Sequence, residues 1–424
     1  MGSRAHLRLL AAAVTCAVAA LAGTGCDGVG RGSHSAQAGG AATTPTSTTP
    51  APAGSPTVKS LTLAFDSIRR RYSGDILGIC MGAIDQQTSA IKCYGRMSPG
   101  SKKKPTRTTL FQIGSLSKTF TATLLALRVQ SGAVGLEDPV RQYLPPDAGN
   151  SQVPDSMTLF DLADHYSGLP RDTPSGEHPP ATVDKYLAEA GSCEASPDCR
   201  QGPPGQRYSY SNYGYGVLGE LLALRDGFSE GAVSAWEQDN NANVSGPLGL
   251  ADTRSWFGWR AISPSTFDTR RARPVRHAVP PYFPPAPYAD AAAGLYSSAN
   301  DMVKWLSFSM GLTGTPDLNQ ARTYLYNTPA LLRPREDRSD KRRRVGLAWR
   351  VDTHGSGKSK VQCVYKDGLT RGFTTSMIFV KDRPIGAFVM LNTEPDTPAI
   401  AAALVNALPS AKKIARSACG VGGG

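Results

Sequence analysis

Three short groups of residues combine a nucleophile, cations and amides at spacings that could support acyl transfer. The first is Ser115-Leu116-Ser117-Lys118, in which a serine and a lysine are three residues apart. If a helix begins near Ser115, the two side chains lie on one face. A lysine in the first turn of a helix, and still more a buried one, loses its proton readily. A neutral Lys118 amine could then take the proton of the Ser115 hydroxyl.

The Ser-x-x-Lys spacing occurs four times in the chain, so its surroundings must decide which occurrence carries chemistry. Three of them lie in a strand-like run, in a Pro/Gly/Lys loop and at the end of a helical pattern: Ser89–Lys92, Ser101–Lys104 and Ser410–Lys413. Ser115 follows an apolar strand-like run, Leu110–Ile113, and opens an amphipathic helical pattern that ends at Gly132. The N–H groups at the start of such a helix could also bind an oxyanion.

A tyrosine and an amide form the second group, Tyr210-Ser211-Asn212. Residues two apart in an extended loop point the same way. A tyrosine hydroxyl near a lysine ammonium has a lowered pKa and can relay a proton, and an Asn amide could hold Lys118 or bind a substrate carbonyl. An aromatic loop that packs on the core is the more frequent explanation of this spacing alone.

The third group is Lys366-Asp367-Gly368, at the end of a strand-like run. A cation at an inner strand edge can hold a substrate carboxylate or assist proton transfer. The backbone N–H of Leu369 could complete an oxyanion hole. By itself Lys-Asp-Gly is most often a plain turn.

In order along the chain, the three groups resemble the class C β-lactamases and the wider family of β-lactamase-related serine hydrolases. That family includes D-alanyl-D-alanine carboxypeptidases and endopeptidases, D-aminopeptidases and esterases. The resemblance runs from about Leu61 to Leu408, and the segment that ends at Ser167–Arg171 is most similar to the carboxypeptidase/endopeptidase branch. It also rests on these stretches: Phe111–Leu127, Gly135–Pro145, Thr158–Asp172, Pro204–Leu222, Pro247–Thr253 and Ala292–Met302.

The resemblance implies an acyl-enzyme on Ser115 that forms without metal or cofactor. Lys118 and Tyr210 would then be the general base and the proton relay, and the Ser115 N–H would be one oxyanion-hole donor. The resemblance also implies that the backbone N–H of Leu369 is the second oxyanion-hole donor. Substrate positioning would be the role of Asn212, Lys366 and Gly368.

Asp367 departs from the family pattern, because β-lactamases and many of the peptidases carry Thr or Ser at this position. An acid beside the expected carboxylate site would repel the carboxylate of a β-lactam or of D-Ala, unless Lys366 or Arg371 neutralises it. An uncharged ester, or a peptide bond inside a chain, stays compatible with Asp367.

His165 could form a serine–histidine pair, but it follows a helical pattern in a turn, which favours a hydrogen-bonded structural role. The chain has no Gly-x-Ser-x-Gly elbow, which argues against an α/β-hydrolase.

The order of elements predicts an α+β fold. A hairpin, Ile76–Ile84 with Ala90–Gly95, comes first, and helical patterns follow it, one starting at Thr158 with Asp161 as a capping pair and another over Tyr213–Leu224. Strand-like runs and a closing helix end the pattern: Gly346–Val351, Val361–Lys366, Phe373–Val380, Ile385–Leu391 and Pro398–Leu408. We expect one antiparallel sheet flanked by helices, with an all-helical lobe and the site between them.

The N-terminus reads as an export signal. Arg4 and Arg8 precede the apolar run Leu9–Gly23, and small residues lead to Cys26, a candidate for lipidation. We expect a signal peptide over 1–26, a disordered Gly/Ser/Thr/Pro linker over 27–57, the hydrolase domain over 58–410 and a tail over 411–424. The protein would be in the periplasm or at the cell surface, either released or anchored through Cys26.

Six cysteines remain after the leader, an even number that suits an oxidising compartment. Six cysteines allow fifteen pairings. The expected hairpin register places Cys80 opposite Cys93, and Cys193 with Cys199 would close a short loop. Cys363 and Cys419 would form the remaining pair. No Cys/His spacing suggests zinc, so no metal is expected.

The formal net charge is +12. The basic clusters lie in loop-like sequence without interleaved aromatics, so a solvated basic face is favoured over nucleic-acid binding. The expected partners are a small-molecule or peptidoglycan-peptide substrate and β-lactams. The sequence therefore favours an exported DD-carboxypeptidase/endopeptidase, with three alternatives still open: a β-lactamase, an esterase and a non-catalytic penicillin-binding protein.

Overall fold

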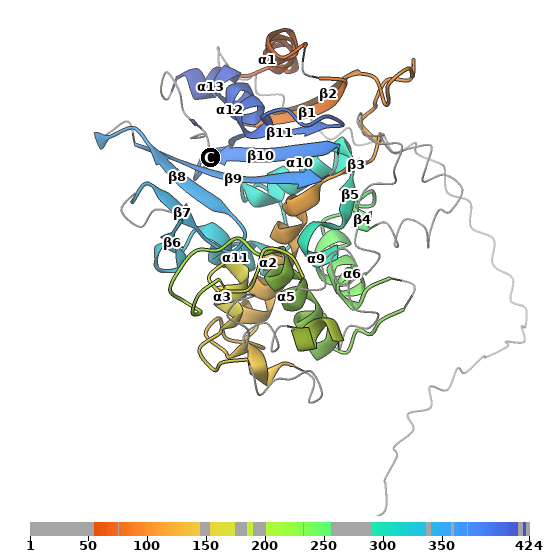
Figure 1. The fold of residues 1–424 in the computed structure, drawn as a ribbon. Helices are drawn as coiled ribbons and strands as arrows, with labels where there is room; N and C mark the ends of the chain where they lie inside the picture. Colours follow the sequence, from red (N-terminus) through yellow and green to blue (C-terminus); the bar gives the residue numbers. More distant parts are fainter. Residues whose placement is uncertain are drawn as a thin grey trace, which may run out of the picture. The chain divides into compact units, whose positions relative to one another are not determined.

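A large antiparallel sheet organises the chain (Figure 1). Its strands run in the order β2-β1-β11-β10-β9-β8-β7-β6. The strands are β1 Gly78–Asp85, β2 Thr88–Gly95, β6 Arg333–Pro334, β7 Arg343–Val345, β8 Arg350–His354, β9 Val361–Thr370, β10 Phe373–Val380 and β11 Ile385–Leu391. The computed structural model describes residues 55–74, 76–144, 153–173, 185–189, 201–231, 233–255, 290–335, 341–357, 360–370, 372–413 and 419–420.

The sheet joins the two ends of the domain, as the sequence predicts. Strand β1 lies between β2, its hairpin partner, and β11, from near the C-terminus. Cys80 is opposite Cys93 in this hairpin, and both strands of the hairpin match the predicted runs. One predicted strand, Gly346–Val351, is only partly confirmed, because Arg350 and Val351 belong to β8 and the residues before them form the turn between β7 and β8. The Gly346 N–H donates to the Trp349 carbonyl there, so Leu347 and Ala348 are buried in a turn.

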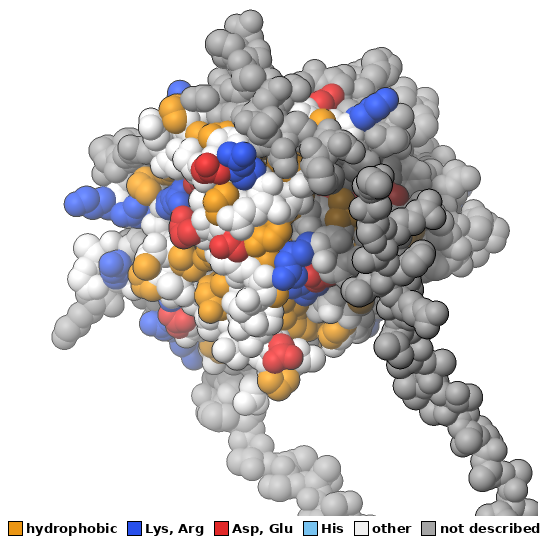
Figure 2. Space-filling view, turned by 90° about the horizontal axis from the view of Figure 1, so that it is seen from below, with side chains coloured by type: hydrophobic (Ala, Val, Ile, Leu, Met, Phe, Trp, Pro, Cys, Tyr) orange, Lys and Arg blue, Asp and Glu red, His pale blue; other side chains and the backbone are white. Residues whose placement is uncertain are grey.

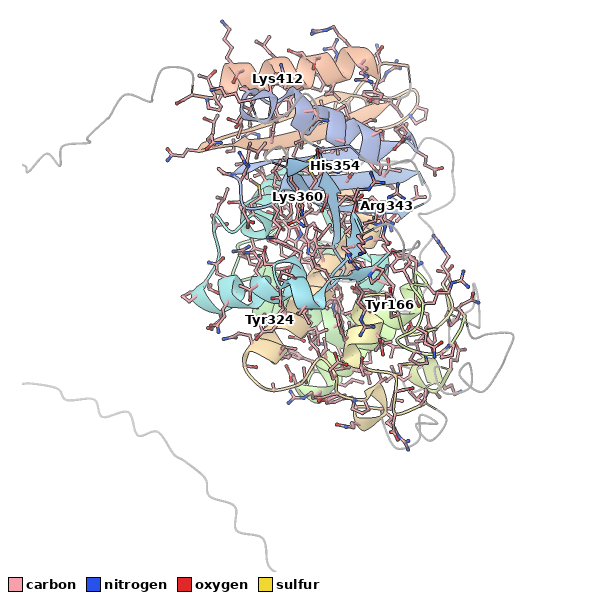
Figure 3. The ribbon with its side chains drawn as sticks, turned by 90° about the vertical axis from the view of Figure 1, so that its left-hand side faces the viewer. Tyr166, Tyr324, Arg343, His354, Lys360 and Lys412 are labelled. Carbon is pink, nitrogen blue, oxygen red and sulfur yellow. A yellow bond between two sulfur atoms is a disulfide. The ribbon has the colours of Figure 1, made fainter. Side chains whose placement is uncertain are left out.

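Three helices pack on one face of the sheet (Figure 1): α1 Val58–Arg71, α12 Thr397–Ala407 and α13 Pro409–Lys412. α12 matches the predicted closing helix. α1 was not predicted, although Leu61, Phe65 and Ile68 bury one side of it at helical spacing. In the side view of Figure 3, Lys412 of α13 lies in this upper layer. His354 of β8 lies in the sheet below it.

The helical part of the fold lies against the other face, around a second hydrophobic core. In Figure 3 it carries Tyr166 and Tyr324. Its helices are η1 Gly114–Ser117, α2 Lys118–Gln130, η2 Val140–Gln142, α3 Leu159–Ala163, α5 Asn212–Arg225, α6 Ala235–Asn240, η4 Asn241–Ser245, α9 Asp290–Ala293, α10 Ala299–Ser309, α11 Pro316–Tyr326 and η6 Pro329–Leu331. A small sheet joins β3 Phe111–Gln112, β5 Leu295–Ser297 and β4 Arg254–Ser255.

Two predicted features of the helical part are confirmed. Thr158 caps α3 in a capping box with Asp161, since each side chain bonds the other residue's backbone N–H. α5 covers the predicted Tyr213–Leu224 helix and begins after Ser211, whose hydroxyl accepts from the Gly214 N–H. Over the described residues, no helix is long and apolar enough to cross a membrane.

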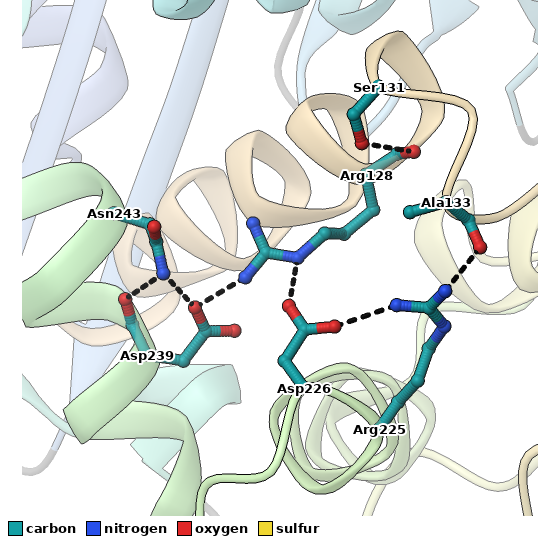
Figure 4. A network of polar contacts seen from close by, with 7 residues as sticks. All are labelled: Arg128, Ser131, Ala133, Arg225, Asp226, Asp239 and Asn243. Atoms are coloured by element: carbon teal, nitrogen blue, oxygen red, sulfur yellow. Dashed lines mark hydrogen bonds and ion pairs between the residues drawn. The ribbon is translucent and has the colours of Figure 1, made fainter. Parts of the chain in front are cut away.

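A partly buried ionic network ties α2 to α5 and α6 (Figure 4). Arg128, in the last turn of α2, pairs with Asp226 at the end of α5 and with Asp239 of α6, the latter at 2.7 Å. Asp239 is fully buried, and Asn243 donates a second hydrogen bond to it. The network therefore holds the C-terminal ends of α2 and α5 together.

The surface of the helical part mixes charges. On the part of this face that the structure describes, Lys and Arg side chains alternate with acidic and hydrophobic ones (Figure 2). They form no continuous basic patch in this view.

Candidate active site

Ser115 lies in a short 3-10 turn, and α2 itself begins at Lys118. The sequence predicted a helix from Ser115, so the first turn is wound more tightly than expected. Gly114 has a φ of 53°, and a Cβ atom there would lie 2.9 Å from the backbone N of Leu369. Glycine is required at this position because strand β9 approaches the backbone so closely.

Lys118 is buried, and its Nζ has three oxygen neighbours. They are the Ser115 Oγ at 3.2 Å, the Asn212 Oδ1 at 2.6 Å and the Ala292 carbonyl at 2.8 Å. Burial, and next the nearby Lys366 cation, hold the Lys118 pKa well below its usual value. In the neutral amine, two N–H groups can face the two carbonyl oxygens, which leaves the lone pair for the Ser115 hydroxyl.

Tyr210 approaches Ser115 from another side, and its hydroxyl donates to the Ser115 Oγ at 2.6 Å. Its ring centre lies 5.0 Å from the Lys118 Nζ and 5.3 Å from the Lys366 Nζ. The sequence predicts a lowered pKa for this hydroxyl. Burial instead raises the Tyr210 pKa, and Asp367 adds to the rise. The tyrosine is therefore a neutral phenol that can donate a proton.

Asn212 is the first residue of α5, not part of an extended loop as the sequence suggested. Its Oδ1 accepts from Lys118, and its Nδ2 donates to the Asp172 Oδ1 at 2.7 Å. Asp172 was not singled out in the sequence, because an exposed aspartate after Pro170-Arg171 has no distinctive spacing.

The third group lies inside β9, because the strand continues to Thr370 rather than turning at Gly368. Lys366 is buried, and burial lowers its pKa to about 8. A Cβ atom on Gly368 would lie 1.9 Å from the Ile113 carbonyl oxygen, so glycine lets β9 pass directly beside the turn that carries Ser115. Leu369 is 61% exposed, and its backbone N lies close to Gly114.

Asp367 is paired with Arg350 of β8, whose Nη1 lies 2.9 Å from the Asp367 Oδ1. Burial would raise the pKa of this carboxyl, but Arg350 and Lys366 outweigh burial, so the pKa falls below its usual value. The sequence predicts Lys366 or Arg371 as the neutralising residue. It missed Arg350, which lies on a neighbouring strand 17 residues away, and Arg371 lies outside the described residues.

His165 packs against the Tyr210 ring and accepts a hydrogen bond from the next residue. Its Nδ1 accepts from the Ser211 N–H at 3.2 Å, and its ring centre lies 4.3 Å from that of Tyr210. Burial and the nearby Lys118 lower its pKa, so the ring is neutral. This arrangement matches the structural role that the sequence favoured for His165.

The structure also joins two of the three predicted cysteine pairs. Disulfide bonds connect Cys80 to Cys93 and Cys363 to Cys419. The candidate pair Cys193–Cys199 and the lipidation candidate Cys26 lie outside the described residues.

Comparison with known proteins assigns the chain to a family. The model of the family described as Beta-lactamase matches residues 65–409. This chain belongs to the β-lactamase family. Its fold and its relatives make it a serine hydrolase of that family, as the resemblance implied.

Two relatives and one solved structure illustrate its place among β-lactamase-family proteins. The chain is 28% identical over 342 residues to the D-alanyl-D-alanine-carboxypeptidase/endopeptidase AmpH of Escherichia coli K12, which covers 77% of this chain and 82% of AmpH. It is 33% identical over 150 residues to a β-lactamase of Pseudomonas fluorescens, and the aligned part covers 35% of this chain and 39% of that one. The class C β-lactamase structure from Rhodobacter sphaeroides superimposes with a TM-score of 0.65 at 23% identity, covering 84% of this chain and all of that one.

Proposed function

We propose that this serine hydrolase is an exported DD-carboxypeptidase/endopeptidase that cleaves peptidoglycan peptides through an acyl-enzyme on Ser115 and also binds β-lactams. The observation that carries the proposal is the convergence of two groups on one oxygen. The Lys118 Nζ lies 3.2 Å and the Tyr210 hydroxyl 2.6 Å from the Ser115 Oγ. A base and a proton donor thus both reach the nucleophile.

The acylation step follows from these contacts. The neutral Lys118 amine takes the Ser115 proton as the Oγ–carbon bond forms, and the backbone N–H groups of Ser115 and Leu369 bind the oxyanion. As the carbon–nitrogen bond breaks, the Tyr210 hydroxyl gives its proton to the leaving amine and is reprotonated from the Lys118 ammonium. Water then cleaves the Ser115 ester and restores the serine hydroxyl.

Cations near the site suit a substrate that ends in a carboxylate. Lys366 is buried beside Tyr210, and Arg171, exposed at 71%, has its guanidinium carbon 5.5 Å from the centre of the same ring. The Arg350 partner offsets the charge of Asp367, which weakens the objection that this acid would repel D-Ala. The similarity to AmpH over most of both chains supports the same substrate class.

An esterase is the second candidate, because Asp367 remains ionised and its side chain is exposed at 30%. An uncharged ester avoids any residual repulsion from this carboxylate. The β-lactamases among the relatives make turnover of β-lactams a further possible outcome of the same experiment.

The proposal that the protein is exported depends on its N-terminal residues. Arg4, Arg8 and the apolar run Leu9–Gly23 lead to Cys26, all outside the described residues. Lipid attached to Cys26 would anchor the mature protein through the linker over 27–57. The mass of the N-terminal peptide of the mature protein tests export and lipidation together.

The deciding experiment is intact-mass spectrometry of the mature protein with a penicillin, beside Ser115→Ala. Ser101→Ala is the matched control, because Ser101 has the same spacing to a lysine but lies in a loop. A stoichiometric adduct that Ser115→Ala loses and Ser101→Ala keeps, together with D-Ala release from a pentapeptide, supports the proposal.

Other outcomes decide against it. Rapid loss of the penicillin without an adduct indicates a β-lactamase. No adduct and no D-Ala release, but hydrolysis of short p-nitrophenyl esters, indicates an esterase.

A further inference from the structure

We infer that Asp172 is a positioning residue for Lys118, acting through the side-chain amide of Asn212. Four polar groups form a chain of successive hydrogen bonds: the Asp172 carboxylate, the Asn212 amide, the Lys118 amine and the Ser115 hydroxyl. The three joining distances are 2.7, 2.6 and 3.2 Å. This inference rests on the proposed role of Ser115 as nucleophile.

The amide of Asn212 needs an acceptor on its far side to keep this arrangement. Its oxygen must face Lys118, because an NH₂ group turned toward an N–H donor would make no hydrogen bond. An ionised carboxylate is the strongest acceptor that the amide Nδ2 can find. Asp172 therefore selects the amide orientation in which Oδ1 accepts from the Lys118 Nζ.

Asp172 is held in place although its side chain is 64% exposed. The segment that carries it is fastened to the start of α5 by its backbone. The Pro170 carbonyl accepts from the Ser211 hydroxyl at 2.6 Å, and the Arg171 carbonyl accepts from the Asn212 N–H at 2.6 Å. A carboxylate at a helix N-terminus is also favoured by the helix dipole. The aspartate is thus oriented before any substrate arrives.

The same carboxylate affects the base electrostatically. Its negative charge stabilises the Lys118 ammonium and therefore raises the Lys118 pKa. This effect opposes burial and the Lys366 cation, which both lower that pKa. The titratable and charged groups around Lys118 are Lys366, Arg171, Asp172, Asp367, Tyr210, Tyr215 and His165. Removing the charge of Asp172 would therefore lower the Lys118 pKa.

Two variants separate orientation from charge. Asp172→Ala removes both the acceptor and the charge, whereas Asp172→Asn can keep an acceptor oxygen and removes only the charge. Asp382→Asn is the control, since Asp382 is an exposed aspartate in the turn between β10 and β11, away from Ser115. The readout is the rate of Ser115 labelling by a fluorophosphonate as a function of pH, which needs no knowledge of the natural substrate.

We expect the plateau rate of Asp172→Ala to fall about 10- to 100-fold, because a misplacement of about 1 Å in a reacting group can cost about 100-fold. Asp172→Asn should retain most of that rate. In both variants the acidic limb of the pH–rate profile should move to lower pH, because Lys118 becomes neutral at a lower pH. The profile of Asp382→Asn should match that of the wild type.

Wild-type rates and an unmoved acidic limb in both Asp172 variants would overturn the inference. A lower rate without any shift of the limb would also overturn it, because it would reduce Asp172 to a structural residue. If the wild type itself is not labelled on Ser115, the proposed function fails instead, so the two failures are distinguishable.

Discussion

Arg128 and Asp226 join the last turns of two helices whose first residues meet at the active site. α2 begins with Lys118 and α5 with Asn212, which bond each other at 2.6 Å, and the ion pair closes the opposite ends (Figure 4). The two helices therefore run side by side in the same direction and are fixed at both ends. We therefore expect the distance between Lys118 and Asn212 to depend also on the Arg128–Asp226 ion pair at the opposite ends of the two helices.

Arg128→Ala should destabilise the protein by about 3 to 5 kcal/mol, because it leaves the fully buried Asp239 without its cation. Urea unfolding measures this loss. Arg141→Ala is the control, since Arg141 pairs with an Asp155 carboxylate that is 76% exposed, and should cost less than about 1 kcal/mol. Equal losses in the two variants would show that the burial of Asp239 does not raise the cost of losing its cation.

The pH dependence of activity should differ between charged and uncharged substrates. Lys118 must be neutral to act as a base, so kcat/KM rises with pH through its lowered pKa and then levels off. Lys366 must be protonated to hold a carboxylate, and its pKa is about 8. Above about pH 8, kcat/KM for a pentapeptide should fall about tenfold per pH unit, while a neutral ester stays on the plateau.

Lys366→Arg tests the origin of that alkaline fall. An arginine keeps its charge throughout this pH range, so the fall for the pentapeptide should disappear in any variant that remains folded. Profiles that fall in parallel for both substrates would show that Lys366 does not hold the carboxylate.

Removal of Arg350 should penalise substrates that carry a carboxylate. In Arg350→Ala, the Asp367 charge is left without its partner at 2.9 Å, so it repels an incoming carboxylate. We expect kcat/KM for a pentapeptide to drop about tenfold or more, with a smaller change for a neutral ester. Adding Asp367→Asn to this variant should restore much of the loss. A double variant as impaired as Arg350→Ala would assign the defect to lost packing.

The two disulfides should contribute unequally to stability. Cys363 and Cys419 are 56 residues apart in the sequence, and Cys80 and Cys93 are 13 apart. Loop-closure entropy predicts a loss of about 4 kcal/mol for the first pair and about 3 kcal/mol for the second when each is replaced by alanines. Urea unfolding of the paired Ala variants measures the losses. A non-reduced digest checks the pairing, including the predicted Cys193–Cys199, and free thiols would contradict it.

The sequence predicted the sheet and the main catalytic group for identifiable reasons. Strong β-runs and a short hairpin fix their own partners locally, and Ser115 stands where an apolar strand meets an amphipathic helix. The strand predicted over Gly346–Val351 begins only at Arg350, because burial in a turn produces the same apolar composition as a buried strand. α1 was missed because a helix that covers a sheet has no signal beyond a short amphipathic pattern.

The parts of the site that were missed depend on contacts between distant segments. Arg350 reaches Asp367 from the next strand, and Asp172 reaches Asn212 from a loop 40 residues earlier. Neither spacing forms a motif in the chain. The direction of the Tyr210 pKa was also mispredicted, because proximity to a cation was considered without the larger effect of burial.

The position of β1 between β2 and β11 has a consequence for the order of folding. Residues such as Met81 and Val389, which face each other across these strands, are separated by most of the domain. The centre of the sheet therefore cannot close until β11 has been synthesised, and the closure of so long a loop makes folding slow. In a chain that emerges from the ribosome, β1 has no β11 to pair with until nearly the last element, so one edge of the β1–β2 hairpin stays unpaired in the meantime. Late closure of the sheet keeps the polypeptide unfolded for longer, and a narrow translocation channel admits only an unfolded chain.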